Sequence, residues 1–231
     1  MTDSTNRDRS ARTARPAGEG QTEHEGSRRG SLDDIRETYA EQASTMARLR
    51  RLDRLLVGRY RRRLFGRATG RVLDVACGTG TNAEYVPETA EYVGVDVSPE
   101  MLREADAELR RLGRGGTLAE MDAQSLAVRD DSFETVISSL STCTFPDPLA
   151  ALGEMNRVCE PDGQVLLLEH GRSSVELLGR LQDWRADAHF EKHRCRWNQN
   201  PLALVSQSDL ALRESSTKLL GVITAIRAEP G

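Results

Sequence analysis

Strand-like and helix-like segments alternate from about residue 70 to the end of the chain, and this alternation constrains the fold more than any other feature. Helix end signals separate the strands, such as Ser98-Pro99 at one start and Gly113 at the matching end. We expect strands at residues 71–76, 91–95, 117–121, 134–138, 164–169, 210–219 and 222–227. The pattern predicts an α/β fold with a doubly wound, seven-stranded sheet that ends in an antiparallel hairpin around Gly221.

The residues before the first strand divide into two parts. Residues 1–30 have no aliphatic side chain beyond alanine and Met1, so we expect a disordered tail. Residues 31–68 have helical spacing, and their apolar stripe consists of Leu49, Leu52, Leu56, Tyr60 and Leu64. We expect lid helices here that cover the carboxyl edge of the sheet with their arginines turned outward. Residues 69–231 would form the α/β core.

Charge and hydropathy exclude several classes of protein. The 32 basic and 36 acidic residues give a net charge of −4, so no global positive field favours nucleic acid. The longest aliphatic run, at residues 165–168, is far shorter than the ~20 apolar residues of a transmembrane helix. No apolar segment follows the N-terminus, so we expect no signal peptide and a cytoplasmic location.

Local spacing predicts neither a redox pair nor a metal site. The cysteines are Cys77, Cys143, Cys159 and Cys195, with no C-x-x-C pair among them. The capping box Ser173-x-x-Glu176 predicts a helix that runs to about His189. His189 and His193 flank its end, but no third ligand lies close in sequence. We therefore expect no bound metal.

The most informative segment is the turn out of the first strand, Asp74-Val-Ala-Cys-Gly-Thr-Gly-Thr-Asn82. Gly78 and Gly80 let the backbone pass close beneath a ligand, where a Cβ would collide. Three successive strands end in an acid: Asp74, suited to a cationic amine, then Asp96, suited to ribose hydroxyls, then Asp122, suited to an adenine amine. Parallel strands share one carboxyl edge, where open α/β sheets bind ligands. The sequence therefore predicts a nucleoside-type ligand at this edge.

A nicotinamide dinucleotide is the alternative ligand, because residues 78–83 also fit the fingerprint of those cofactors. That fingerprint places a phosphate over the helix N-terminus, where Asp74 would have no role. Hydride-transfer enzymes also commonly need a proton donor such as a Tyr/Lys pair, and Lys192 and Lys218 both lie far down the chain. These features favour a ligand other than a dinucleotide.

Four segments carry a resemblance to a known family: residues 74–80, 93–102, 122–123 and 157–163. In them the chain resembles class I S-adenosylmethionine-dependent methyltransferases, in the branch of quinone C-methyltransferases and small-molecule thiol or phospholipid methyltransferases. The resemblance implies a Rossmann-like methyltransferase domain at residues 31–231, with S-adenosyl-L-methionine as cofactor. It implies methyl transfer to a small-molecule acceptor such as a thiol, a quinol carbon or a lipid headgroup.

The resemblance also implies which residues hold the cofactor. Asp74, Gly78 and Gly80 would hold the methionine portion, and Asp96 the ribose. Met101 would pack against the adenine, and Ser138 would lie near the sulfonium. The full set of expected cofactor contacts is Tyr39, Asp74, Ala76, Cys77, Gly78, Thr79, Gly80, Asp96, Val97, Met101, Asp122, Ala123 and Ser138.

In-line methyl transfer needs alignment more than acid–base chemistry, so few catalytic residues are expected. His170 is the candidate acid or base, with a hydrogen-bonded structural histidine as the alternative. Cys143 either lines the acceptor pocket or packs as a small hydrophobe. Cys195 and Trp197 either form a pocket wall or pack in the core. Glu169-His170-Gly171 and residues 195–198 resemble the thiol/phospholipid-type relatives more than the quinone enzymes.

Two further alternatives concern partners and function. The arginine-rich helix at residues 48–63 is either a solvated face or a surface that rests on an anionic membrane. The segment Ser138-Ser-Leu-Ser-Thr142 lacks the Asn/Asp-Pro-Pro-aromatic signature of base methylation, so we expect no nucleic-acid substrate. A non-catalytic cofactor-binding protein is the alternative function. We favour an enzyme because every expected cofactor contact is present.

Overall fold

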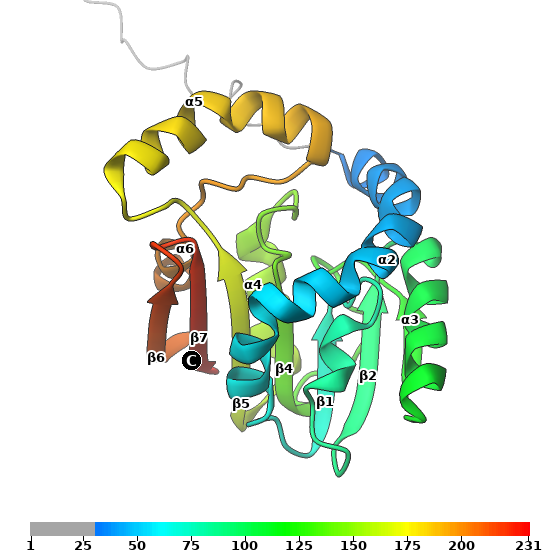
Figure 1. Cartoon of the computed structure of the whole chain (residues 1–231). Coiled ribbons are helices and arrows are strands. Elements are labelled where there is room, and N and C mark those ends of the chain that lie inside the picture. Colours follow the sequence, from blue (N-terminus) through cyan, green and yellow to red (C-terminus); the bar gives the residue numbers. More distant parts are fainter. Residues whose placement is uncertain (1–30) are drawn as a thin grey trace, which may run out of the picture.

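The computed structural model describes residues 31–231 and shows a seven-stranded sheet with helices on both faces (Figure 1). The predicted tail at residues 1–30 lies outside the described residues. The strands are β1 (Arg71–Val75), β2 (Glu91–Asp96), β3 (Thr117–Glu120), β4 (Phe133–Ser139), β5 (Cys159–His170), β6 (Ala211–Lys218) and β7 (Ile223–Glu229). The helices are α2 (Leu32–Phe65), the 3₁₀ helix η1 (Thr81–Glu84), α3 (Pro99–Leu112), α4 (Pro148–Val158), α5 (Glu176–His193) and α6 (Pro201–Gln207).

The sheet has the strand order β3-β2-β1-β4-β5-β7-β6, which confirms the predicted doubly wound α/β fold. Strands β1 to β5 pair in parallel, whereas β7 runs antiparallel to both β5 and β6. The predicted hairpin is present, and Gly221 adopts a φ of 91° in its turn. The strand order reverses between β1 and β4, so the loops that leave these two strands diverge and open a crevice at their carboxyl ends.

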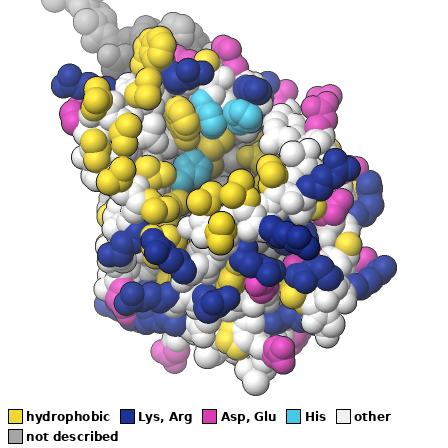
Figure 2. Space-filling model, viewed as in Figure 1, with side chains coloured by type: hydrophobic (Ala, Val, Ile, Leu, Met, Phe, Trp, Pro, Cys, Tyr) yellow, Lys and Arg dark blue, Asp and Glu magenta, His cyan; other side chains and the backbone are white. Residues whose placement is uncertain are grey.

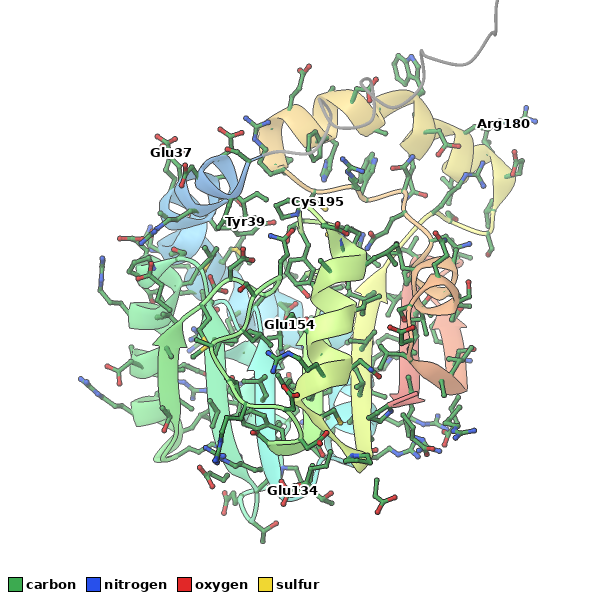
Figure 3. The ribbon with its side chains drawn as sticks, turned by 180° about the vertical axis from the view of Figure 1, so that it is seen from behind. Glu37, Tyr39, Glu134, Glu154, Arg180 and Cys195 are labelled. Atoms are coloured by element: carbon green, nitrogen blue, oxygen red, sulfur yellow. The ribbon has the colours of Figure 1, made fainter. Side chains whose placement is uncertain are left out.

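The two faces of the sheet bury separate hydrophobic layers. Alternate residues of a strand point to opposite faces, so β5 contributes to both layers. Val165 and Leu167 pack with α4 and α6 on one face, and Leu166 and Leu168 pack with α2 on the other (Figures 1 and 3). None of the four is more than 1% exposed. This burial on both faces explains why the middle of β5 carries no charge.

Local signals set the ends of α3 as predicted, and a similar signal begins α4. The Ser98 hydroxyl accepts a hydrogen bond from the Met101 N–H at 3.3 Å, and Pro99 opens the helix. Gly113 ends α3 with a φ of 64°, in the left-handed region that favours glycine. The Asp147 carboxylate caps α4 in the same way as Ser98 caps α3. The loops that border the crevice lead from β2 into α3 and from β4 into α4.

Residues 32–65 form one continuous 34-residue helix, not the several lid helices predicted. Most of the predicted apolar stripe is not buried: Leu49, Leu52 and Leu56 are each more than half exposed, and only Leu64 at its end is buried. The buried residues are Ile35, Ala43, Val57, Gly58, Arg61, Leu64 and Phe65. Arg61 donates hydrogen bonds to Asn82 and Ser139 beneath the helix, and this orientation turns Leu52 and Leu56 outward.

α5 stands away from the sheet as an arch (Figure 1), and Gly179 alone among its residues is buried. The predicted capping box does not form, because the helix begins after Val175 without a side-chain cap. The Ser173 hydroxyl instead donates to the Leu220 carbonyl at 2.6 Å. The helix continues to His193, about one turn beyond the predicted end.

Candidate functional site

A cavity of about 250 Å³ lies at the carboxyl edge of the sheet, between the loops after β1, β2 and β4 and the inner side of α2. One bound water needs only ~10–15 Å³, so this cavity can accept an organic ligand. Ten of the predicted cofactor contacts line it: Tyr39, Ala76, Cys77, Gly78, Thr79, Asp96, Val97, Met101, Asp122 and Ala123. The predicted contacts Asp74, Gly80 and Ser138 are not part of this lining.

The two glycines of the turn after β1 have different roles. Both have a positive φ, 54° at Gly78 and 75° at Gly80. A Cβ added to Gly80 would lie 3.0 Å from the Ala105 backbone, so this glycine allows α3 to pack against the turn. A Cβ added to Gly78 would meet no atom within 4 Å, although Gly78 lines the cavity. A ligand in the cavity could therefore occupy the free space next to Gly78.

Asp96 ends β2 at the wall of the cavity, and two main-chain groups fix its carboxylate. The Gly78 N–H donates to Oδ2 and the Ser98 N–H donates to Oδ1, both at 2.9 Å. Burial raises the pKa of Asp96, and these two hydrogen bonds oppose that shift. Because a carboxylate has more acceptor sites than these two bonds use, Asp96 can also accept bonds from ligand hydroxyls.

Apolar side chains line the end of the cavity near β2 and β3. Val97, Met101, Met121 and Ala123 form this part of the wall, which suits a flat aromatic ring. Asp122 lies beside them and accepts hydrogen bonds from the Gln124 main chain at 2.9 Å and from its side chain at 3.1 Å. Polar groups of the ligand that reach Asp122 would therefore meet an oriented carboxylate.

Asp74 does not occupy the predicted position next to a ligand amine. Its carboxylate is fully buried behind the cavity wall, where it accepts hydrogen bonds from the Asn82 amide at 3.0 Å and the Tyr92 hydroxyl at 2.6 Å. Burial raises the pKa of Asp74 to about 7, despite these two bonds. Asp74 instead positions Asn82, which does line the cavity. Ser138 is similarly turned away and donates to the Val75 carbonyl at 2.8 Å.

The inner face of α2 brings charged residues to the cavity that the sequence analysis missed. The prediction that the arginines of this helix turn outward is wrong for Arg50 and Arg61. Arg61 is buried, pairs with Asp53, and donates to the Asn82 side chain at 3.0 Å. The helical spacing of residues 50, 53, 57 and 61 was a signal for this inner face, but the more obvious leucine stripe masked it.

Arg50 has one polar atom without a partner. Its terminal nitrogens donate to Glu108 at 2.6 Å and to the Thr79 carbonyl at 3.0 Å. Its Nε is buried and has no hydrogen-bond partner. Because buried donors are rarely left unsatisfied, this N–H at the cavity indicates an acceptor supplied by a ligand.

Tyr39 lines the cavity as predicted, whereas His170 does not. Burial raises the pKa of Tyr39, and the nearby thiols of Cys143 and Cys195 act in the same direction. Figure 3 shows Tyr39 on the inner side of α2 and Cys195 below α5, both above the carboxyl edge of the sheet. His170 Nε2 lies 3.1 Å from the Cys143 sulfur and 3.3 Å from the Cys195 sulfur. The proposed acid or base thus faces two thiols outside the cavity lining.

The sequence is similar to that of known methyltransferases. Residues 73–167 match the family described as "Methyltransferase domain". The chain is similar to the mitochondrial methyltransferase OMS1 of Saccharomyces cerevisiae, with 28% identity over 76% of this chain and 41% of that protein. It is also similar to a phosphatidylethanolamine N-methyltransferase of Cereibacter sphaeroides, with 34% identity over 53% of this chain and 60% of that protein. The chain therefore spans only part of the length of both relatives.

The predicted resemblance to class I methyltransferases is confirmed. The fold agrees with it: a solved S-adenosylmethionine-dependent methyltransferase of Thermotoga maritima, described as a possible histamine N-methyltransferase, aligns with a TM-score of 0.62 and 20% identity. That alignment covers 85% of this chain and all of the other. The matched methyltransferase domain contains the glycine turn, Asp96 and Asp122, and it implies S-adenosylmethionine as the cofactor.

The cavity fits that cofactor in three respects. The open space at Gly78 leaves room for a ligand against the main chain. Asp96 has acceptor capacity at the position expected for a ribose. The unpartnered Arg50 Nε offers a donor for a carboxylate. A ligand with an adenine, a ribose and an amino-acid end would satisfy all three features.

Proposed function

We propose that this chain binds S-adenosylmethionine in the cavity and transfers its methyl group to a small-molecule acceptor. The observation that carries the proposal is the combination of groups in one cavity. It joins a glycine turn that is open to a ligand, a fixed carboxylate at the end of β2 and an unpartnered arginine donor under α2. None of these groups alone would distinguish a cofactor site from an ordinary crevice.

The cofactor supplies a methyl group that its sulfonium charge already activates, so the task of the protein is positioning. Asp96 would hold the ribose, Met101 and Val97 would pack on the adenine, and Arg50 Nε would donate to the carboxylate. The inner face of α2, including Tyr39, lines the cavity and would shield the bound cofactor from water. Alignment of this kind can contribute several kcal/mol, roughly up to 7–11 in well-oriented reactions, without a catalytic base.

An amphiphilic acceptor fits the cavity mouth best. Met46 and Leu49 line the cavity and are also 41% and 52% exposed, so the cavity meets the surface through apolar side chains. Figure 2 shows hydrophobic side chains gathered on both sides of a hollow between α5 and α2. This apolar mouth favours a quinol or a lipid headgroup with its chain attached, and an apolar thiol is the alternative acceptor.

We further propose that the outer face of α2 contacts an anionic membrane. No helix among the described residues is long and apolar enough to span a bilayer, so this contact would be peripheral. Leu52, Leu55 and Leu56 are 52–81% exposed, and exposed arginines lie between and beside them: Arg48, Arg51, Arg59, Arg62 and Arg63. Binding to vesicles with anionic phospholipid that weakens in high salt, with little binding to neutral vesicles, is the expected result.

The test of methyl transfer uses cofactor with a labelled methyl group and a panel of quinols, aminophospholipids, thiols and phenols. Label should appear in an acceptor of one class, and calorimetry should show one cofactor site per chain. Tight cofactor binding without transfer to any acceptor would favour the non-catalytic alternative. Absence of cofactor binding, or equal binding of a nicotinamide dinucleotide, would contradict the proposal.

A further inference from the structure

Three potential metal ligands converge where α5 returns to the sheet. Cys143 follows β4, His170 ends β5, and Cys195 follows α5. The two sulfurs lie 3.1 Å apart, and the three donor atoms all lie within 4.8 Å of one another. Their separation along the chain is large, which is why local spacing predicted no metal site. The fold, not the sequence spacing, assembles the group.

Neighbouring groups orient these donors toward a common point. The His170 imidazole hydrogen-bonds the main chain at Trp197. Because Nε2 faces the two sulfurs, we assign this bond to Nδ1–H, which leaves the Nε2 lone pair directed at the cluster. Main-chain hydrogen bonds of this kind fix the tautomer of metal-binding histidines. The tautomer of His170 is therefore the one that a metal ion requires.

The cluster is also shielded from water. Cys143 is 2% exposed and Cys195 is 9% exposed, so both sulfurs lie in the interior of the protein. Binding of a divalent ion would form two metal–sulfur bonds and one metal–nitrogen bond, and the two thiol protons would be released to solvent.

We propose that Cys143, His170 and Cys195 bind one zinc-type cation that fastens the α5 arch to the carboxyl edge of the sheet. Two thiolates and an imidazole are the donor set that zinc prefers. At metal distances of about 2.0–2.3 Å, tetrahedral angles place such donors roughly 3.6–3.8 Å apart, so the cluster needs to open by only about half an ångström. This inference does not depend on the proposed methyl transfer.

A fourth donor is within reach of the cluster. His189 hydrogen-bonds the Cys195 sulfur and stacks on Trp197, with ring centroids 4.3 Å apart. Figure 2 shows histidine side chains in the hollow under α5, beside the apolar patches. His189 lies on α5 itself, so a bond from His189 to the ion would attach the helix as well as the loop that follows it.

Little apolar burial attaches the α5 arch, and its main hydrogen-bonded attachment is Gln182, which accepts from the Ser173 N–H at 2.6 Å. An ion near the C-terminal end of the helix would add a second attachment. Gly179 alone of the α5 residues is buried, and the ion pairs of α5 involve exposed side chains such as Arg172 with Asp183. Exposed ion pairs contribute little, typically 0–1 kcal/mol. The Arg196 N–H donates to the Cys143 carbonyl at 3.0 Å, which places the two cysteine-bearing loops side by side without tying α5 down.

The test uses the full-length chain, purified with reductant and without chelator, and measures bound metal by mass spectrometry. We expect about one zinc per chain in the wild type and in Cys159→Ser, a control at a buried cysteine outside the cluster. Cys143→Ser and Cys195→Ser should each bind at least about tenfold less metal, because they remove a sulfur ligand, and loss of even an outer-shell partner of a ligand commonly lowers metal affinity by about 10–100-fold. Equal metal content in all four proteins would overturn the proposal.

A second measurement avoids the risk that a cysteine variant misfolds. Cobalt(II) titrated into metal-free wild type should give the near-ultraviolet thiolate-to-cobalt band and the visible bands of a tetrahedral site at one equivalent. Removal of the ion should also speed proteolysis within residues 176–195. A titration without a thiolate band would overturn the proposal, as would a Cys143–Cys195 disulfide in metal-free protein kept under reductant.

Discussion

The carboxyl edge of the sheet and the α5 arch lie next to each other but are stabilised by different means. At the edge, Asp74 and Asp96 are buried, and each accepts two hydrogen bonds from neighbouring segments. In the arch, Leu177 and Trp184 are both 78% exposed, and the polar contacts are exposed ion pairs together with a few hydrogen bonds centred on Gln182. The edge is rigid because packing and hydrogen bonds specify it together, whereas the arch depends on the few groups at its base.

The largest expected effect is on the free energy of unfolding, because the sheet buries its leucines and the α5 arch exposes them. Leu166→Ala in β5 removes a fully buried side chain and should lower the free energy of unfolding by about 2–5 kcal/mol. Leu177→Ala in α5 removes an exposed side chain and should change it by less than about 0.5 kcal/mol. Chemical denaturation of both variants measures the contrast. A large loss in Leu177→Ala would mean that the arch is packed more firmly than its exposure indicates.

A second contrast concerns pH. The pKa of Asp74 rises from 3.8 to about 7 in the folded chain, so the folded state keeps a proton that the unfolded state has lost. Stability from this group therefore falls as pH rises from about 4 to about 7. Asp74→Asn should reduce that fall in the melting temperature, whereas Glu176→Gln on the exposed arch should leave it unchanged above pH 5. A wild-type slope retained in Asp74→Asn would contradict the assignment.

The sequence predicted the sheet and its edge well because short-range signals determine them. The Ser98 and Gly113 helix ends, the uncharged centre of β5 and the turn at Gly78 each depend on a few consecutive residues. The strands and most predicted cavity contacts follow from those signals together with the known parallel arrangement of such folds.

The predictions that were wrong concern contacts between distant segments. The sequence showed a leucine stripe on α2, but burial of Arg61 against Asn82 decides which side of the helix faces inward. Asp74 has the right residue type and the right strand, but the hydroxyl of Tyr92 on β2 reaches it and holds it behind the cavity. The Cys143–Cys195 contact likewise joins residues 52 positions apart, beyond the reach of any local pattern.

Cofactor binding should distinguish the carboxyl edge of the sheet from the α5 arch, because the proposed contacts lie at the edge. Asp96→Ala leaves the Gly78 and Ser98 main-chain donors without their acceptor and removes the proposed ribose contact. Affinity for S-adenosylhomocysteine should fall by about 1–3 kcal/mol in calorimetry. The exposed Asp187→Ala on α5 is the matched control and should bind as the wild type does. Similar losses in both variants would place the cofactor elsewhere.

Arg50 tests the role of the buried donor that lacks a partner. Arg50→Ala removes the Nε donor, and cofactor affinity should fall by about 1.5 kcal/mol, the low end for hydrogen bonds to charged groups. Its neighbour Arg51 is exposed, so Arg51→Ala should leave affinity unchanged. The melting temperature must be measured as well, because Arg50→Ala also leaves Glu108 with one arginine fewer. A loss of stability with normal affinity would make Arg50 structural.

The smallest expected effect concerns Tyr39, where the cavity approaches the base of the arch. Tyr39 covers the cavity from α2, so cofactor binding should slow hydrogen exchange across residues 35–47. Tyr39→Ala should lower turnover about fivefold, roughly 1 kcal/mol, and lower stability by less. Tyr60→Ala, at a half-buried position on the same helix outside the cavity lining, is the control for general loss of an aromatic ring. Unchanged exchange at saturating S-adenosylhomocysteine would show that α2 does not respond to the ligand. The helix would then be a fixed wall of the cavity, and its exposed leucines and arginines would be explained by the membrane contact alone.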